Sequence, residues 1–106
     1  MSEHQQQLLE EAKAWRTVAK RINARGIKSG FCADLFWNEG TAKGLDSSLR
    51  ERMGQRVNDH MTLLSADGAD YYDYNRATYF DKPGARRSRI MAALFLAAEA
   101  ESEAAA

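Results

Sequence analysis

Residues 8–25, with the sequence LLEEAKAWRTVAKRINAR, decide the fold that we expect of this chain. Apolar side chains recur in them at steps of three and four residues, the spacing that places side chains on one face of an α-helix. This face consists of Leu8, Ala12, Trp15, Ala19 and Ile22, with Leu9 and Val18 widening it. Ser2 and Gln5 have the capping-box pattern and Gly26 is a natural stop, so we predict one helix from about residue 3 to residue 25.

The other side of this helix is basic. It carries Lys13, Arg16 and Lys20, with Arg21 and Arg25 at the edge of the apolar face. One interpretation is a contact with nucleic-acid phosphates or with an acidic protein. The other is a solvated surface whose cations suit the carboxyl end of a helix dipole. The whole chain has 15 basic and 15 acidic residues, and this balance favours the solvated surface.

Three more helices are predicted beyond Gly26. Residues 31–37 hold apolar and aromatic side chains at helical spacing, and Asp46 or Ser47 can cap a third helix that reaches residue 64. Residues 90–100 are apolar around most of a helical circumference, so we expect this last helix at the centre of the fold. The chain thus predicts one mainly α domain over residues 1–106, a small bundle of about four helices.

The segment before the last helix is rich in tyrosine. Residues 71–79 hold all four tyrosines of the chain. We expect an irregular loop that covers the helical core, and a short β-hairpin centred on residues 75–77 is the alternative.

Charges in the last helix run against its dipole. Three arginines, Arg86, Arg87 and Arg89, follow its predicted start, where the dipole is positive. Three glutamates, Glu99, Glu101 and Glu103, lie near its end, where the dipole is negative. Two explanations for the arginines stay open. An external phosphate or carboxylate would bind the arginines and the helix N-terminus together. Alternatively, the arginines pair internally with the acidic residues that precede them, Asp67, Asp70, Asp73 and Asp81.

The external explanation defines a candidate site for a partner protein or a phosphorylated small ligand. Tyrosine rings beside the arginines can stack on a base or fill a pocket of the partner. The site consists of Tyr71, Tyr72, Tyr74, Arg76, Tyr79, Arg86, Arg87 and Arg89. The alternative function is nucleic-acid binding through Lys13, Arg16, Lys20 and Arg21, or through the third helix with Arg50, Arg52 and Arg56 in a helix-turn-helix. The connection between the second and third helices is long and glycine-rich for that motif.

No pattern in the chain indicates catalysis. It contains no glycine-rich phosphate loop, no cluster with metal-ligand spacing and no nucleophile paired with a base. Cys32 is expected as a buried thiol, and His60 as a half-buried, hydrogen-bonded side chain beside the apolar face of the third helix. We therefore expect a protein that is not an enzyme and needs no cofactor. One cysteine, no signal peptide and no long apolar run predict a soluble, cytoplasmic protein that does not bind membranes.

Several short motifs resemble a group of short, mostly uncharacterised accessory proteins of tailed bacteriophages. They are Ala14-Trp15-Arg16 with Val18-Ala19, Gly30-Phe31-Cys32 with Leu35 and Trp37, Arg52-Met53, Arg56-Val57 and His60, Tyr71-Tyr72-Asp73-Tyr74, and Arg89-Ile90 through Phe95-Leu96-Ala97. The resemblance implies a protein that acts in the cytoplasm of the infected host. It also implies a non-enzymatic inhibitor that counters host defence by occluding a host protein or sequestering a phosphorylated ligand. A homo-oligomeric assembly component is a further alternative.

Replacing Arg86 and Arg87 together separates the two explanations for the arginines. If they hold an external anion, the Arg86→Ala/Arg87→Ala variant loses the bound ligand or partner, while its helix content and melting temperature stay near wild type. Native mass spectrometry of both proteins taken from cells measures the ligand, and circular dichroism measures the fold. A double variant that unfolds would favour internal pairing with the aspartates.

Overall fold

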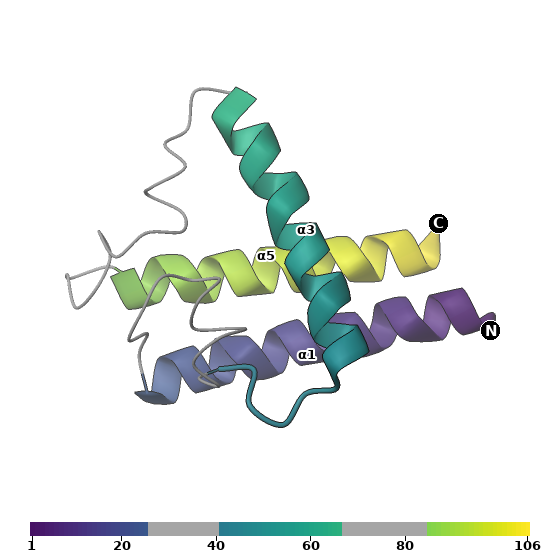
Figure 1. The fold of residues 1–106 in the computed structure, drawn as a ribbon, viewed down its shortest axis with the longest axis horizontal. Coiled ribbons are helices and arrows are strands. Elements are labelled where there is room, and N and C mark those ends of the chain that lie inside the picture. Colours follow the sequence, from purple (N-terminus) through teal and green to yellow (C-terminus); the bar gives the residue numbers. More distant parts are fainter. Residues whose placement is uncertain (26–40, 67–84) are drawn as a thin grey trace.

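The computed structural model describes residues 1–25, 41–66 and 85–106, and in them the chain is mainly helical, as the sequence predicts (Figure 1). Helix α1 spans Glu3–Arg25, α3 spans Ser47–Ala66 and α5 spans Ala85–Ala105. The helix expected at residues 31–37 and the tyrosine-rich segment lie outside the described residues. The described part of the chain therefore contains three helices, and the count of four stays a prediction.

Helix α1 begins with the predicted capping box. Ser2 Oγ accepts a hydrogen bond from the Gln5 backbone N–H at 3.1 Å, and Gln5 Oε1 accepts one from the Ser2 N–H at 3.0 Å. The predicted apolar face is buried, with Trp15 and Val18 completely enclosed. Leu9 was wrongly assigned to this face, since its surface is 39% exposed. Nine residues at about 100° each place Leu9 on the opposite side of the helix from Val18.

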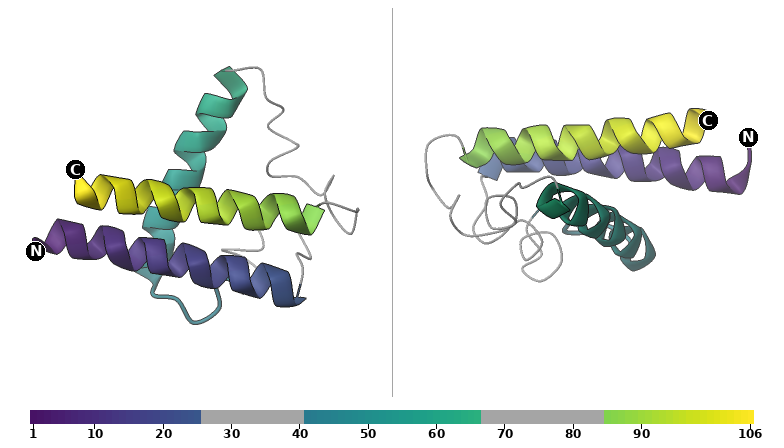
Figure 2. Two further views of the ribbon diagram at one scale, coloured as in Figure 1. Left: turned by 180° about the vertical axis from the view of Figure 1, so that it is seen from behind. Right: turned by 90° about the horizontal axis from the view of Figure 1, so that it is seen from above.

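Helices α1 and α5 lie side by side and run in opposite directions, which brings both ends of the chain to the same end of the pair (Figures 1 and 2). Alanines dominate the α5 side of this interface, with Ala93, Ala97, Ala100 and Ala104 all buried. Their small side chains let the two helices approach closely. Gln5 Nε2 also donates a hydrogen bond to the Ala104 carbonyl oxygen at 3.0 Å, which ties the start of α1 to the end of α5.

Helix α3 crosses one face of the α1/α5 pair (Figure 2). Asp46 caps its start, as predicted, because Asp46 Oδ2 accepts hydrogen bonds from the N–H groups of Ser48 and Leu49 at 3.1 and 3.3 Å. Met53 and Val57 are completely buried and belong to the same core cluster as the buried side chains of α1 and α5. The three helices thus share one apolar core.

The turn before α3 is fastened to α1. Gly44 has a φ of 82°, a left-handed conformation that glycine adopts without steric cost. Arg21 of α1 donates from Nη1 to the carbonyl oxygens of Thr41 and Lys43, at 3.1 and 2.6 Å. Arg21, which the sequence suggested for contact with nucleic acid, therefore positions the entry into α3.

The prediction that the last helix lies at the centre of the fold was wrong. Helix α5 leaves three large apolar side chains at the surface: Met91 is 62% exposed, Leu94 37% and Phe95 55%. Of the seven largest completely buried side chains in the described residues, α1 contributes three, Trp15, Val18 and Ile22, whereas α5 contributes only Leu96. A sequence that is apolar all round a helix is compatible with a central position. It is equally compatible with a helix that packs one face and exposes large apolar side chains on the other.

Enlarging an alanine of the α1/α5 interface should destabilise the protein. We expect Ala97→Leu to lower the free energy of unfolding by about 1–3 kcal/mol, because Ala97 is completely buried and the interface has no room for an isobutyl group. Urea denaturation measures this change. Ala98→Leu is the matched control, since Ala98 is exposed on the next position of the same helix, and its effect should stay within about 0.5 kcal/mol. Equal effects of the two substitutions would contradict the tight packing inferred for this interface.

Candidate binding surface

Arg56 of α3 joins the three described helices. Its guanidinium holds the Glu11 carboxylate of α1 with two N–H groups, one of them Nη2 at 3.1 Å from Glu11 Oε1. Its Nη1 donates to Glu99 of α5 at 2.7 Å and also to Glu103, one turn further along α5. The Arg56 side chain is 11% exposed and that of Glu11 only 3%. We call Arg56 with these three glutamates the arginine junction, in which one guanidinium pairs with a buried carboxylate and with two that are partly exposed.

Two ring side chains complete the arginine junction. Trp15 Nε1 donates a hydrogen bond to Glu11 Oε2 at 2.9 Å. His60 Nε2 lies 2.6 Å from Glu99 Oε2, and the His60 ring meets the Phe95 ring edge to face with centroids 4.8 Å apart. The prediction of a half-buried, hydrogen-bonded His60 is therefore confirmed.

The arginine junction shifts the pKa values of Arg56 and Glu99 toward their charged forms. Burial by itself would lower the pKa of the Arg56 guanidinium, but its hydrogen bonds to Glu11, Glu103 and Glu99 outweigh burial and raise the pKa. Burial by itself would raise the pKa of Glu99, but hydrogen bonds from Arg56 and His60 outweigh it and lower that pKa below the ordinary value of 4.5. Arg56 and Glu99 are thus both ionised at neutral pH.

The arginine junction explains the glutamates near the end of α5. Glu99 and Glu103 pair with Arg56, and Glu101 pairs with Arg16 of α1. Ion pairs to other helices therefore offset the unfavourable position of these carboxylates in the α5 dipole. The same pairing removes Arg56 from the helix-turn-helix interpretation, because its guanidinium is enclosed by carboxylates. The rest of that interpretation stays a prediction, since residues 31–37 lie outside the described residues.

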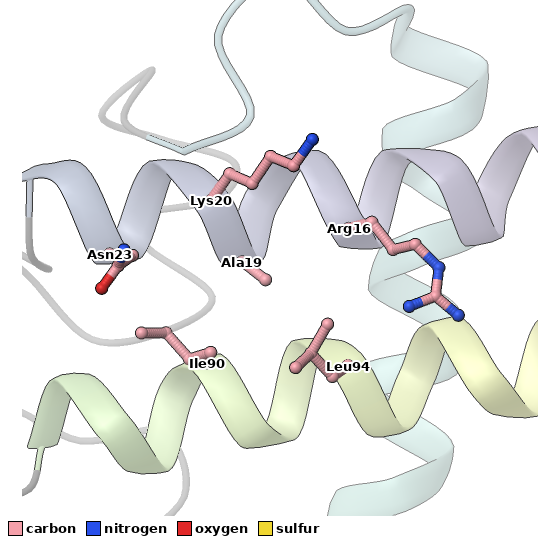
Figure 3. A pocket seen from close by; sticks show the side chains of 6 residues that line it. All are labelled: Arg16, Ala19, Lys20, Asn23, Ile90 and Leu94. Atoms are coloured by element: carbon pink, nitrogen blue, oxygen red, sulfur yellow. The ribbon is translucent and has the colours of Figure 1, made fainter.

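A groove of about 450 Å³ lies between α1 and α5 (Figure 3). Its lining comes from both helices and consists of Arg16, Ala19, Lys20, Asn23, Ile90 and Leu94. Figure 3 shows Ala19 and Leu94 pointing into the space between the helices, Arg16 reaching from α1 toward α5, and α3 behind the pair. The groove therefore opens on the side away from α3, with an apolar wall on α5 and a polar, positively charged wall on α1.

Exposed apolar side chains extend the surface beyond the groove. At about 100° per residue, Met91, Leu94 and Ala98 fall within about 60° of one another on α5, and Leu9 falls close to Lys20 on α1. We call this surface the open face, and define it by Leu9, Lys13, Arg16, Lys20, Ile90, Met91 and Leu94. Clustered apolar side chains with polar neighbours are typical of interaction sites on soluble proteins.

Four of the five cations predicted for the first helix have described side chains, and these four fall into two pairs. Arg16 and Arg21 are engaged within the protein, by Glu101 and by the turn carbonyls. Lys13 and Lys20 are exposed, and neither makes an ion pair with the described part of the chain. The positive charge that α1 offers to a partner therefore comes mainly from these two lysines.

The predicted arginine and tyrosine site is described only in part. Arg89 is buried, with 3% of its surface exposed. Arg86 and Arg87 belong to the first turn of α5, and their side chains lie outside the described part of the chain. The same holds for Cys32 and for the remaining residues of the two explanations, Asp67, Asp70, Tyr71, Tyr72, Asp73, Tyr74, Arg76, Tyr79 and Asp81. Anion binding and internal pairing by the arginine cluster therefore both stay predictions.

The described residues contain neither a cluster of metal ligands nor a membrane-spanning helix. No group of three or more His, Cys, Asp or Glu side chains there is arranged to hold a metal ion. The helices of that part of the chain include none with the length and apolarity needed to cross a membrane.

No protein-family model, curated protein or solved structure matches the chain.

The open face was not predicted from the sequence, because Met91 and Leu94 were assigned to the core, whereas Ile90 does pack against it. A row of alanines marks the packed side of α5, which also carries the completely buried Leu96. The buried side carries alanine at positions 93, 97, 100 and 104, whereas the larger side chains at 91, 94 and 95 are exposed. Reasoning also missed the arginine junction, since Glu11 and Arg56 are 45 residues apart and no local pattern connects them.

Acid should destabilise the protein through Glu99. Its pKa is lowered in the folded state, so its contribution is fully present above the ordinary value of 4.5 and disappears as the pH falls through the folded pKa. We expect Glu99→Gln to reduce the free energy of unfolding at pH 7 by about 1–2 kcal/mol. Below pH 4.5 the free energy of unfolding of the variant should fall less steeply with pH than that of wild type. Urea midpoints between about pH 3 and pH 7 measure both effects. Glu51→Gln, at an exposed position of α3, is the control. A decline in Glu99→Gln as steep as in wild type would contradict this role of Glu99.

Proposed function

We propose that this protein works without catalysis, by binding a partner protein through its open face and occluding part of that partner. The observation that supports the proposal most is the combination of a groove and exposed large apolar side chains on one face of the α1/α5 pair. Leu94 lines the groove, and Met91 beside it is mostly exposed. Burying one such side chain contributes about 1.5–3 kcal/mol, so a few of them suffice for a specific contact.

The polar residues of the described chain support binding rather than chemistry. The largest convergence of titratable groups is the arginine junction, where each carboxylate already accepts a hydrogen bond from Arg56. A catalytic acid or base needs a proton that it can exchange with a substrate, whereas Arg56 and Glu99 hold each other in their ionised forms. Their role in this proposal is to fix the three helices so that the open face keeps its shape.

The partner is a protein in this proposal because the open face has few free cations. Strong nucleic-acid binding uses many phosphate contacts. Of the five cations on α1, Arg16 and Arg21 are already engaged within the protein, and the Arg25 side chain lies outside the described part of the chain. The resemblance to bacteriophage accessory proteins would make the partner a host protein and the occlusion an anti-defence activity.

Charge and size substitutions on the open face test the proposal. Leu94→Lys should weaken capture of the partner from host-cell extract at least about tenfold, since it replaces an apolar contact by a charge. Quantitative mass spectrometry of proteins retained by the immobilised wild type and variant measures the loss. A thermal melt should show that the variant folds, because Leu94 is partly exposed.

Lys43→Glu is the control for nonspecific surface effects. Lys43 is exposed in the turn before α3, away from the groove lining, and its substitution should leave capture unchanged. The proposal would be overturned if Leu94→Lys captured as much partner as wild type, or if Lys43→Glu reduced capture as much as Leu94→Lys does.

A further inference from the structure

We infer that the occupant of the open face is a single amphipathic helix of a partner protein, with acidic residues on the side that faces α1. The inference rests on the proposed function, which it deepens by naming the chemistry of the partner. Three features of the open face support it: the direction of the groove, the spacing of its apolar side chains and its unbalanced positive charge.

The groove has the direction and length that suit a helix. Its α1 lining consists of Arg16, Ala19, Lys20 and Asn23, which follow one another on successive turns. The groove therefore runs parallel to the two helix axes for two turns, or about 10 Å. Helices α1 and α5 form a layer with α3 on one side (Figure 2), and a helix laid along the other side would pack as in an ordinary bundle.

The apolar side chains of the open face have helical spacing. Ile90 and Leu94 are four residues apart on α5 and both line the groove, with Met91 exposed beside them. One helix packs on another by placing apolar residues at steps of three and four against such a row. An occupying helix would therefore present apolar side chains at positions i, i+3 or i+4, and i+7.

The charge of the open face selects an acidic flank. Lys13 and Lys20 are one heptad apart along α1, so they lie on the same side of that helix, about 10 Å apart. Glu101 of α5 pairs with Arg16 and Glu11 of α1 pairs with Arg56, while the exposed Glu10, one turn before Lys13, makes no ion pair with either lysine. The wall formed by α1 therefore keeps the positive charge of both lysines. Acidic residues one heptad apart on the occupant would meet them, and basic residues there would be repelled.

Selection from a library of displayed helical peptides tests this inference on the full chain. The library randomises the charged and apolar positions of an 18-residue helical scaffold, and counter-selection against the Leu94→Lys variant removes peptides that bind elsewhere. We expect enrichment of peptides with an apolar row at helical spacing and with Asp or Glu one heptad apart beside it. Enriched peptides that are basic on that flank, or that are not helical when bound, would overturn the inference.

Charge exchange then tests the lysine contacts with an enriched peptide. Lys13→Glu/Lys20→Glu should raise its dissociation constant about three- to tenfold, as expected for two exposed ion pairs. Replacing Glu by Gln in the peptide should remove this difference between wild type and variant. Lys43→Glu, measured by the same fluorescence anisotropy titration, should change nothing. An equal dissociation constant for wild type and the lysine double variant would contradict the acidic flank.

Two other occupants would overturn the inference and are measured alongside it. A second copy of the chain would appear in light scattering as a dimer that Leu94→Lys converts to monomer. Nucleic acid would appear as binding to a labelled DNA duplex that weakens steeply with salt and is lost in Lys13→Glu/Lys20→Glu.

The failure of the inference and that of the proposed function give different results. Peptides of another chemistry that need Leu94 would overturn the acidic helix and leave the proposed function intact. If neither the library nor the extract yields any binder that depends on Leu94, the proposed function fails as well.

Discussion

A single guanidinium determines how the three described helices fit together. The Glu11 carboxylate on α1 is almost completely removed from water, and an ion in such a place is costly unless it is paired. Arg56 supplies the pair, and because the same group also holds Glu99 and Glu103, the position of α3 is fixed against both other helices. Apolar packing brings the helices together, whereas the arginine junction specifies one crossing arrangement among the several that apolar surfaces permit.

The helix starts could be predicted from the sequence because their signals are local. Ion pairs between residues far apart in the sequence could not be predicted. The capping box of Ser2 and Gln5 and the cap at Asp46 depend on neighbours within three residues, so the sequence displays them directly. The partners of Arg56 lie more than 40 residues away. The glutamates near the end of α5 therefore looked misplaced until the structure supplied their cations. Apolar periodicity likewise identified α5 as a helix without indicating which side is packed.

Charge and apolar surface are distributed in an unusual way between the inside and the outside of this protein. Several of its ionised side chains are enclosed, while Met91, Leu94 and Phe95 of α5 remain at the surface. Leaving large apolar groups in water lowers stability relative to burying them. An open face that is retained despite this cost is understandable if another molecule covers it during function, and the buried ion pairs keep the face in place meanwhile.

The alanine interface between α1 and α5 has a consequence for the alignment of the two helices. Small side chains form a smooth contact, and a smooth contact holds two cylinders together without strongly opposing a slide along their axes. Polar contacts between the two helices then fix their alignment along the axes. Two of these contacts are the hydrogen bond from Gln5 to the Ala104 carbonyl oxygen and the ion pair of Arg16 with Glu101. A slide by one turn would move Ile90 and Leu94 past Ala19 and give the groove a different outline. The shape presented to a partner is thus set by a few hydrogen bonds that lie outside the apolar core.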